Sequence, residues 1–230
     1  MTAVCFDNVT FRHQYDDFDV LCGATFALDE QTCTVLIDSQ CGKTTLCRLL
    51  MGELKAQNGQ ILLDGAPVDN VKPGNVGMLY LSCRGLFFDG KSVAQNIAYP
   101  LVVRKIERKT RDKIVASVVE RLAIADLLAK RVRDLTDDQR RLVVLARGLT
   151  VPRRIVLFDD FFVAERHAET PFDSYDMQTV FALFVDSTKV VVTSNPNLAI
   201  GKTAVIDGGK CVLCGTPEQA VALVADLEWK

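Results

Sequence analysis

The sequence predicts an α/β fold that combines a mostly parallel sheet, an antiparallel β subdomain near the N-terminus and a helical subdomain in the middle of the chain. Apolar and polar residues alternate in the segments 3–13 and 20–30, which indicates half-exposed antiparallel strands. Unbroken apolar runs follow at 33–37, 155–158 and 190–192, and such runs are typical of strands covered on both faces of a parallel sheet. Apolar residues at helical spacing lie between these runs.

Helices are predicted in three places. The segment 43–54 follows the first buried run through a short loop, so strand, loop and helix come in that order. Apolar residues recur at helical spacing within 110–130 and again within 142–149. No repeat, linker or low-complexity tract divides the chain, so we expect a single domain, 1–230, with a helical subdomain inserted at about 92–150.

Composition and charge narrow the class of protein. The 230 residues are 49% hydrophobic and 24% charged, as expected of a globular protein with a substantial core. A formal net charge of -2 gives no reason to expect a broad nucleic-acid or anionic-membrane surface. The N-terminus lacks a basic start followed by an apolar run, and no apolar stretch approaches the length of a membrane span. We therefore expect a soluble, cytosolic chain that does not bind nucleic acid.

The cysteines predict no disulfide framework. All 8 are dispersed through the chain, and reduced thiols fit a cytosolic protein of this size better than disulfides. Cys211 and Cys214 have the spacing of a metal or redox site. The surrounding sequence reads as two short strands around a turn at 207–209, and residues three apart in a strand point to opposite faces. We favour a hairpin over a metal site.

The loop before the first predicted helix resembles a phosphate-binding loop. In such loops, backbone N–H groups surround the phosphates, a lysine reaches them, and the next hydroxyl holds Mg²⁺. Ile37 stands where the pattern asks for a glycine, which costs about 1 to 3 kcal/mol if that backbone is strained. We therefore expect nucleotide binding that is weakened but retained. The predicted nucleotide-binding residues are Ser39, Gln40, Cys41, Gly42, Lys43, Thr44 and Thr45.

Two aspartates end the apolar run at 155–158. A carboxylate at the end of a buried strand, opposite a phosphate-binding loop, can hold the water bound to Mg²⁺, and the next carboxylate can polarise an attacking water. The sequence therefore predicts Thr44 and Asp159 as metal-site residues and Asp160 as the catalytic residue.

Further stretches complete a recognisable order of motifs. Residues 134–149, DLTDDQRRLVVLARGL, are similar to a family signature that usually reads L-S-G-G-Q. Residues 208–219 resemble the same family's closing hairpin and following helix, and 76–88 with 93–101 resemble the region around its glutamine loop. Together with the loop and the paired aspartates, the chain resembles the nucleotide-binding subunit of an ABC transporter over nearly its whole length.

The resemblance implies a P-loop NTPase (RecA-like) core that uses ATP and Mg²⁺. It also implies permease subunits as partners, a homodimer or a heterodimer with another nucleotide-binding subunit, and a peripheral position on the cytoplasmic face of the membrane.

The departures from the family fall on its catalytic residues. Asp160 replaces the catalytic glutamate with a side chain one methylene shorter, and a misplacement of about an ångström can cost roughly a hundredfold in rate. Ser194 replaces the histidine that the family calls its switch residue. Leu81 or Ser82 replaces the glutamine of the family's glutamine loop. In the family, an aspartate lies in the segment just after the paired aspartates, and Arg166 replaces it here. The resemblance with these departures predicts impaired hydrolysis.

The signature is changed most clearly, and its predicted residues are Thr136, Asp137, Asp138 and Gln139. In the family, the signature of one subunit contacts the γ-phosphate bound by the other. Two carboxylates in place of glycines repel a triphosphate and block close approach of the backbone. Aspartates also favour helix N-termini, so these residues can instead simply start a helix over 139–149.

The family's adenine-stacking aromatic corresponds to His13 or Tyr15. We expect His167, the only other histidine, to be a surface residue. The family's docking surface for the permease corresponds to about 86–100, where Phe87 and Phe88 either receive a permease helix or belong to the core.

Three functions are compatible with these features. The first is a degenerate ATP-binding subunit that contributes docking and static nucleotide binding. The second is a divergent but active ABC transporter ATPase that energises import or lipid trafficking through Asp160. The third is a non-transport interaction protein on the same scaffold.

Overall fold

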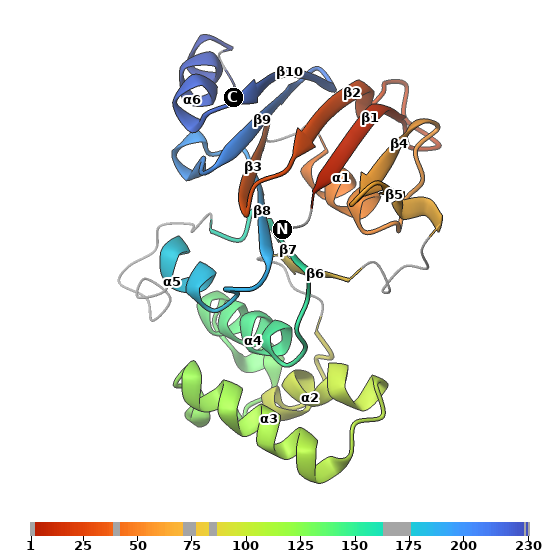
Figure 1. Cartoon of the computed structure of the whole chain (residues 1–230). Helices are drawn as coiled ribbons and strands as arrows, with labels where there is room; N and C mark the ends of the chain where they lie inside the picture. Colours follow the sequence, from red (N-terminus) through yellow and green to blue (C-terminus); the bar gives the residue numbers. More distant parts are fainter. Residues whose placement is uncertain are drawn as a thin grey trace. The chain divides into compact units, whose positions relative to one another are not determined.

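The computed structural model describes residues 3–38, 42–70, 77–82, 87–162, 176–227 and 229. The chain divides into two compact units. The first, called the sheet unit below, comprises residues 1–80, 154–160 and 186–230, and the second, called the helical unit, comprises 81–153 and 161–185. Figure 1 labels the elements of both.

An antiparallel sheet forms the N-terminal part of the sheet unit. Its strand order is β2-β1-β4-β5. These strands are β1 (Val4–Phe11), β2 (Leu21–Leu28), β4 (Asn58–Leu63) and β5 (Ala66–Pro67). The alternation in the first 30 residues therefore correctly predicted two paired antiparallel strands.

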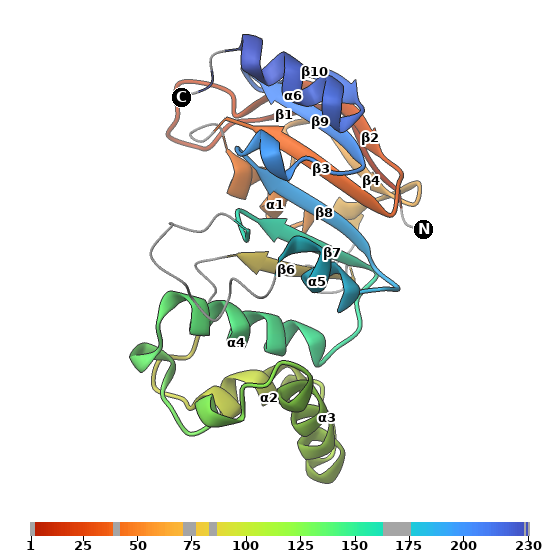
Figure 2. The same ribbon diagram turned by 90° about the vertical axis from the view of Figure 1, so that its left-hand side faces the viewer.

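A second, mostly parallel sheet has the order β10-β9-β3-β8-β7-β6, and Figure 2 shows its strands side by side. β3 pairs in parallel with β8 and β9, and β7 pairs in parallel with β8, whereas β10 runs antiparallel to β9. The strands are β3 (Thr32–Ile37), β6 (Met78–Ser82), β7 (Ile155–Asp159), β8 (Thr188–Thr193), β9 (Lys202–Asp207) and β10 (Lys210–Gly215). The predicted parallel sheet and closing hairpin are both present.

Both faces of the parallel sheet are covered, which explains its continuous apolar runs. Val35 and Ile37 point into a core shared with helix α1 (Lys43–Leu50) and the antiparallel sheet. Leu36 points to the opposite face, where it packs with α6 (Pro217–Asp226). A strand with two buried faces cannot alternate apolar and polar residues, and this one does not.

Helix α1 is shorter than predicted. It ends at Leu50, and the chain then turns at Gly52, whose φ is +69°. Glycine adopts this left-handed conformation without steric cost, so the prediction of a helix through residue 54 was wrong at its C-terminal end.

The helical unit contains α2 (Val93–Val103), α3 (Arg108–Arg121), α4 (Asp137–Leu149) and α5 (Met177–Ala182). The helix predicted within 110–130 extends beyond the observed one. Helix α3 ends at Arg121, and Ala123 has a φ of +52°, which is outside the helical region. Within the described part of the chain, no helix has both the length and the hydropathy that a membrane span requires.

Candidate functional site

Gly42 forms the start of α1 and has a backbone that few other residues adopt. Its φ is +93°, and a Cβ added there would lie 2.2 Å from Cγ1 of Val20. Because the N-cap is a glycine, it offers no side chain to the first N–H groups of α1, which have no acceptor within the helix. Such a helix start favours an anion. The predicted residues Ser39, Gln40 and Cys41 lie outside the described residues.

Lys43, the first residue of α1, contacts Asp160. The Lys43 Nζ to Asp160 Oδ2 distance is 3.4 Å, and the two side chains are 8% and 30% exposed. Burial raises the pKa of the Asp160 carboxyl, the charge of Lys43 opposes this, and the neighbouring Asp159 adds to the rise. The Lys43 ammonium, which would bind a phosphate, is therefore already paired with the Asp160 carboxylate.

Asp160 is held by its backbone at the end of β7. Its φ is +46°, in the left-handed region, and its N–H donates to the Val192 carbonyl over 3.0 Å. Asp160 Oδ1 is buried, and no hydrogen-bond partner for it lies among the described residues. A buried acceptor of this kind is suited to a donor such as a water molecule.

Asp159 receives two hydroxyl donors on one oxygen. Thr44 Oγ1 donates to Asp159 Oδ2 over 2.9 Å, and the Tyr80 hydroxyl donates to the same oxygen over 2.6 Å. Asp159 is only 4% exposed, so these bonds compensate the carboxylate for lost water. The predicted metal-site residues Thr44 and Asp159 are thus in contact, and Tyr80 is a further residue that bonds to Asp159.

No local pattern singles out Tyr80, which stands on β6. Its role depends on the order of strands in the sheet, where β6 follows β7. Strand order across a parallel sheet is not encoded in local spacing, so a tyrosine in an apolar strand reads as core.

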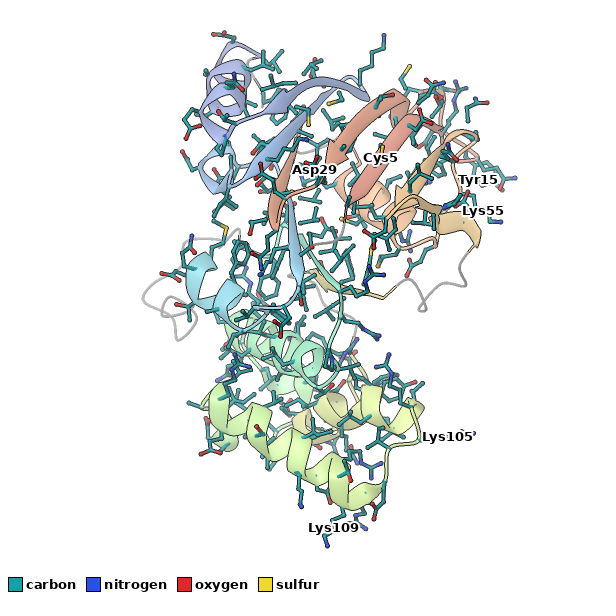
Figure 3. All side chains as sticks on the ribbon, in the orientation of Figure 1. Cys5, Tyr15, Asp29, Lys55, Lys105 and Lys109 are labelled. Carbon is teal, nitrogen blue, oxygen red and sulfur yellow. The ribbon has the colours of Figure 1, made fainter. Side chains whose placement is uncertain are left out.

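His13 lies against α1. Its Nε2 is 3.0 Å from Thr45 Oγ1, and its ring meets Phe11 edge to face with centroids 4.9 Å apart. Tyr15 is 91% exposed, and Figure 3 shows it pointing away from the sheet unit. Of the two predicted adenine-stacking candidates, His13 is the one in contact with the helix that carries Lys43.

The signature residues form a helix cap in the helical unit. Thr136 Oγ1 accepts the Gln139 backbone N–H over 3.3 Å, and Gln139 Oε1 accepts the Thr136 backbone N–H over 3.2 Å. This capping box starts α4 at Asp137, so the predicted start at 139 was wrong, and the N-cap is a threonine and not an aspartate.

Both signature aspartates are paired within their own helix. Asp137 Oδ1 lies 3.7 Å from Arg140 Nη1, and Asp138 Oδ1 lies 3.5 Å from Arg141 Nη1. The first pair is exposed on the aspartate side (86%), whereas the second is mostly buried (17% and 10%). Since an arginine follows each aspartate by three residues, much of the predicted negative field is compensated locally.

The other predicted positions differ in accessibility. Leu81 is buried at 1% exposure, and Ser82 and Ser194 are half-buried. Arg166 and His167 lie outside the described residues. An apolar Leu81 side chain cannot bind a metal ion or a water.

The predicted docking segment contains a polar anchor that sequence reasoning missed. Asn96 is fully buried, its Oδ1 accepts the Phe88 N–H over 3.0 Å, and its Nδ2 donates to the Phe88 carbonyl over 3.2 Å. The Phe88 ring packs on Tyr99 with centroids 4.3 Å apart, and each residue is 37% exposed. Phe87 is half-buried, and Leu86 lies outside the described residues. Phe88 therefore lies at the surface of the helical unit.

The described residues fit a magnesium nucleotide. Lys43 supplies a cation beside a helix N-terminus, and Thr44 and Asp159 supply hard oxygen atoms in mutual contact. Among the described residues no group of three His, Cys, Asp or Glu side chains could hold a metal ion.

Comparisons with known proteins agree on one family. A family model described as ABC transporter matches residues 21–163. The molybdate/tungstate import ATP-binding protein WtpC of Methanocaldococcus jannaschii is 32% identical over 136 residues, which is 59% of this chain and 46% of that protein. The sn-glycerol-3-phosphate import ATP-binding protein UgpC 1 of Rhizobium johnstonii is 26% identical over 197 residues, which is 80% of this chain and 51% of that protein. The chain spans about half the length of these relatives.

Solved structures share the fold. A bacterial Atm1-family ABC exporter with ATP bound matches with a TM-score of 0.80 at 22% identity, over 98% of this chain and 41% of that one. CbiO1 of Clostridium perfringens, part of the ABC transporter complex CbiONQ, matches with a TM-score of 0.73 at 18% identity, over 98% of this chain and 94% of that one. At these identities the likeness concerns the fold alone.

Proposed function

The chain belongs to the ABC transporter family, and from that premise we propose that it is an ATP-binding subunit that holds nucleotide but hydrolyses it slowly or not at all. The observation that carries the proposal is the pair of contacts at the start of α1. Thr44 bonds to Asp159, whereas Lys43 is engaged by Asp160.

The retained half of the site supports nucleotide binding. Gly42, Lys43 and the first turn of α1 would bind the phosphates, and Thr44 with Asp159 would hold Mg²⁺. Bound Mg²⁺ would neutralise phosphate charge. His13 is the residue best placed to contact the base, because it lies against Thr45.

The altered half of the site argues against fast hydrolysis. A general base must reach a water in line with the phosphate, and Asp160 is shorter than a glutamate and turned toward Lys43. The signature aspartates oppose a triphosphate even after local pairing, because Asp137 remains 86% exposed. Each site of a dimer would combine the phosphate-binding loop and aspartates of one subunit with the signature of the other. In a homodimer both contributions would be impaired in each site. In a heterodimer with an intact subunit, one of the two contributions to each site would be impaired.

One observation favours the second candidate, an active but divergent ATPase. Burial raises the pKa of the Asp160 carboxyl, and a more basic carboxylate is a better proton acceptor. Asp160→Asn separates the two candidates, since it abolishes ATP hydrolysis if Asp160 is the base and leaves a slow rate unchanged if it is not.

The assembly we propose follows the relatives' names. The two reported relatives are import ATP-binding proteins, so we propose that the whole chain, 1–230, is one nucleotide-binding domain of an importer. It would lie on the cytoplasmic face of the membrane, dock against permease subunits through the Phe88 and Tyr99 surface, and pair with a second nucleotide-binding subunit. The substrate would be selected by the permease.

Calorimetric titration with Mg-ATP tests nucleotide binding. We expect micromolar binding by the wild-type chain and loss of binding in Lys43→Ala. Lys55→Ala is the matched control, because Lys55 is an exposed lysine of the same unit, and it should bind as the wild type does. Absence of wild-type binding would contradict nucleotide binding and would favour a purely structural interaction protein.

A further inference from the structure

Two protein hydroxyls donate to the Asp159 carboxylate. Asp159 is 4% exposed, and its Oδ2 accepts hydrogen bonds from Thr44 and from the Tyr80 hydroxyl. A carboxylate oxygen has about two lone-pair sites, so these two donors use both sites of Oδ2. At 2.6 Å, the bond from Tyr80 is at the short end of the range for hydroxyl donors.

A phenol and a metal-bound water make the same kind of bond to a carboxylate. Magnesium dehydrates reluctantly and keeps several waters, which donate O–H groups to nearby carboxylates. The Tyr80 phenol makes this donation itself. Since Thr44, the other metal-site residue, also bonds to Oδ2, a water on a metal ion held by Thr44 would lie near this oxygen.

We propose that Tyr80 is a positioning residue whose hydroxyl occupies the place of a magnesium-bound water at Asp159, so that nucleotide binding by this chain depends little on Mg²⁺. The proposal rests on the proposed function, because it concerns the same nucleotide site. It differs in predicting that Mg²⁺ adds little to the affinity, whereas the proposed function assigns Thr44 and Asp159 to the metal and predicts that nucleotide binds.

Tyr80→Phe removes the hydroxyl and keeps the ring. Asp159 Oδ2 then has a free lone-pair site that a metal-bound water can use, so the gain in ATP affinity given by Mg²⁺ should rise on the order of tenfold over the wild-type gain. Thr110→Val is the control. It removes an exposed hydroxyl in α3, and it should leave the metal dependence as in the wild type.

The test is calorimetric titration with ATP in excess Mg²⁺ and in excess chelator, for the wild type and both variants. A larger ratio of the two affinities in Tyr80→Phe supports the proposal. Equal ratios in the wild type and Tyr80→Phe overturn it, even if the variant melts at a lower temperature, because a merely structural hydroxyl would lower stability without changing the ratio.

A second measurement decides the question if no chain binds ATP, a result that would refute the proposed function. Melting temperature is then measured with Mg²⁺ alone. A metal-dependent increase in Tyr80→Phe that exceeds the wild-type increase supports the role of the hydroxyl, and equal increases overturn it.

Discussion

At the scale of single residues, the site is defined by which carboxylate contacts which cation or hydroxyl. Lys43 contacts Asp160 at 3.4 Å, while Asp159 contacts Thr44 and Tyr80. The motif spacing predicts that Thr44 and Asp159 lie at the same end of the sheet, and the two side chains are in contact there. The spacing does not predict that Asp160 turns toward Lys43, because that orientation depends on a φ of +46° that no local pattern encodes for aspartate.

Neutralising Asp160 is expected to strengthen ATP binding. Asp160→Asn removes a carboxylate that competes with the phosphates for Lys43, and a partly exposed ion pair of this kind contributes about 1 kcal/mol, or roughly fivefold in affinity. Calorimetric titration measures the change. Asp69→Asn, an exposed acid of the same unit, is the control and should have no effect. Unchanged or weaker binding in Asp160→Asn would show that the Lys43 contact does not restrain the site.

Asp160 also predicts a pH dependence of stability. Its folded pKa is raised above the ordinary 3.8, so the native state holds this proton to a higher pH than the unfolded state does. The contribution of Asp160 to the free energy of unfolding should therefore fall as pH rises from about 3.8 through the raised pKa, so the stability of the wild type relative to Asp160→Asn should fall over that range. Urea unfolding of both chains across that range provides the measurement. A difference in stability that is constant with pH would contradict the raised pKa.

At the scale of elements, helix and strand types followed from periodicity, but helix ends did not. The apolar stripe of α4 predicted a helix around 142–149, whereas the capping box at Thr136 and Gln139 set its start at Asp137. Polar residues of the first turn carry no hydrophobic period, so their place in the helix depends on side-chain bonds to the backbone. The same limit applies to Asn96, a buried polar residue in α2 that reads as surface.

Loss of the signature cap is expected to destabilise the helical unit. Thr136→Ala removes the acceptor for the Gln139 N–H and should lower the free energy of unfolding by about 1 kcal/mol. Thr110→Ala, an exposed threonine in α3, is the control and should cost less than about 0.5 kcal/mol. Chemical denaturation followed by circular dichroism measures both. Equal losses would show that the capping box contributes nothing.

At the scale of the whole molecule, the family and its fold were predicted from the order of motifs along the chain. The antiparallel sheet, the parallel sheet and the helical unit are all present, because each depends on periodicities that the sequence carries over many residues. The state of the catalytic machinery depends on a few side chains, whose effect on rate varies with distances of about an ångström.

The most direct test of the proposed function is phosphate release from Mg-ATP by the purified chain, at an ATP concentration that calorimetry shows to be saturating. We expect ATP to bind in a Lys43-dependent manner and to remain almost entirely intact, with the same slow release in Asp160→Asn. Release at about one turnover per second or faster, abolished by Asp160→Asn, would contradict the proposal and would identify Asp160 as a working catalytic base.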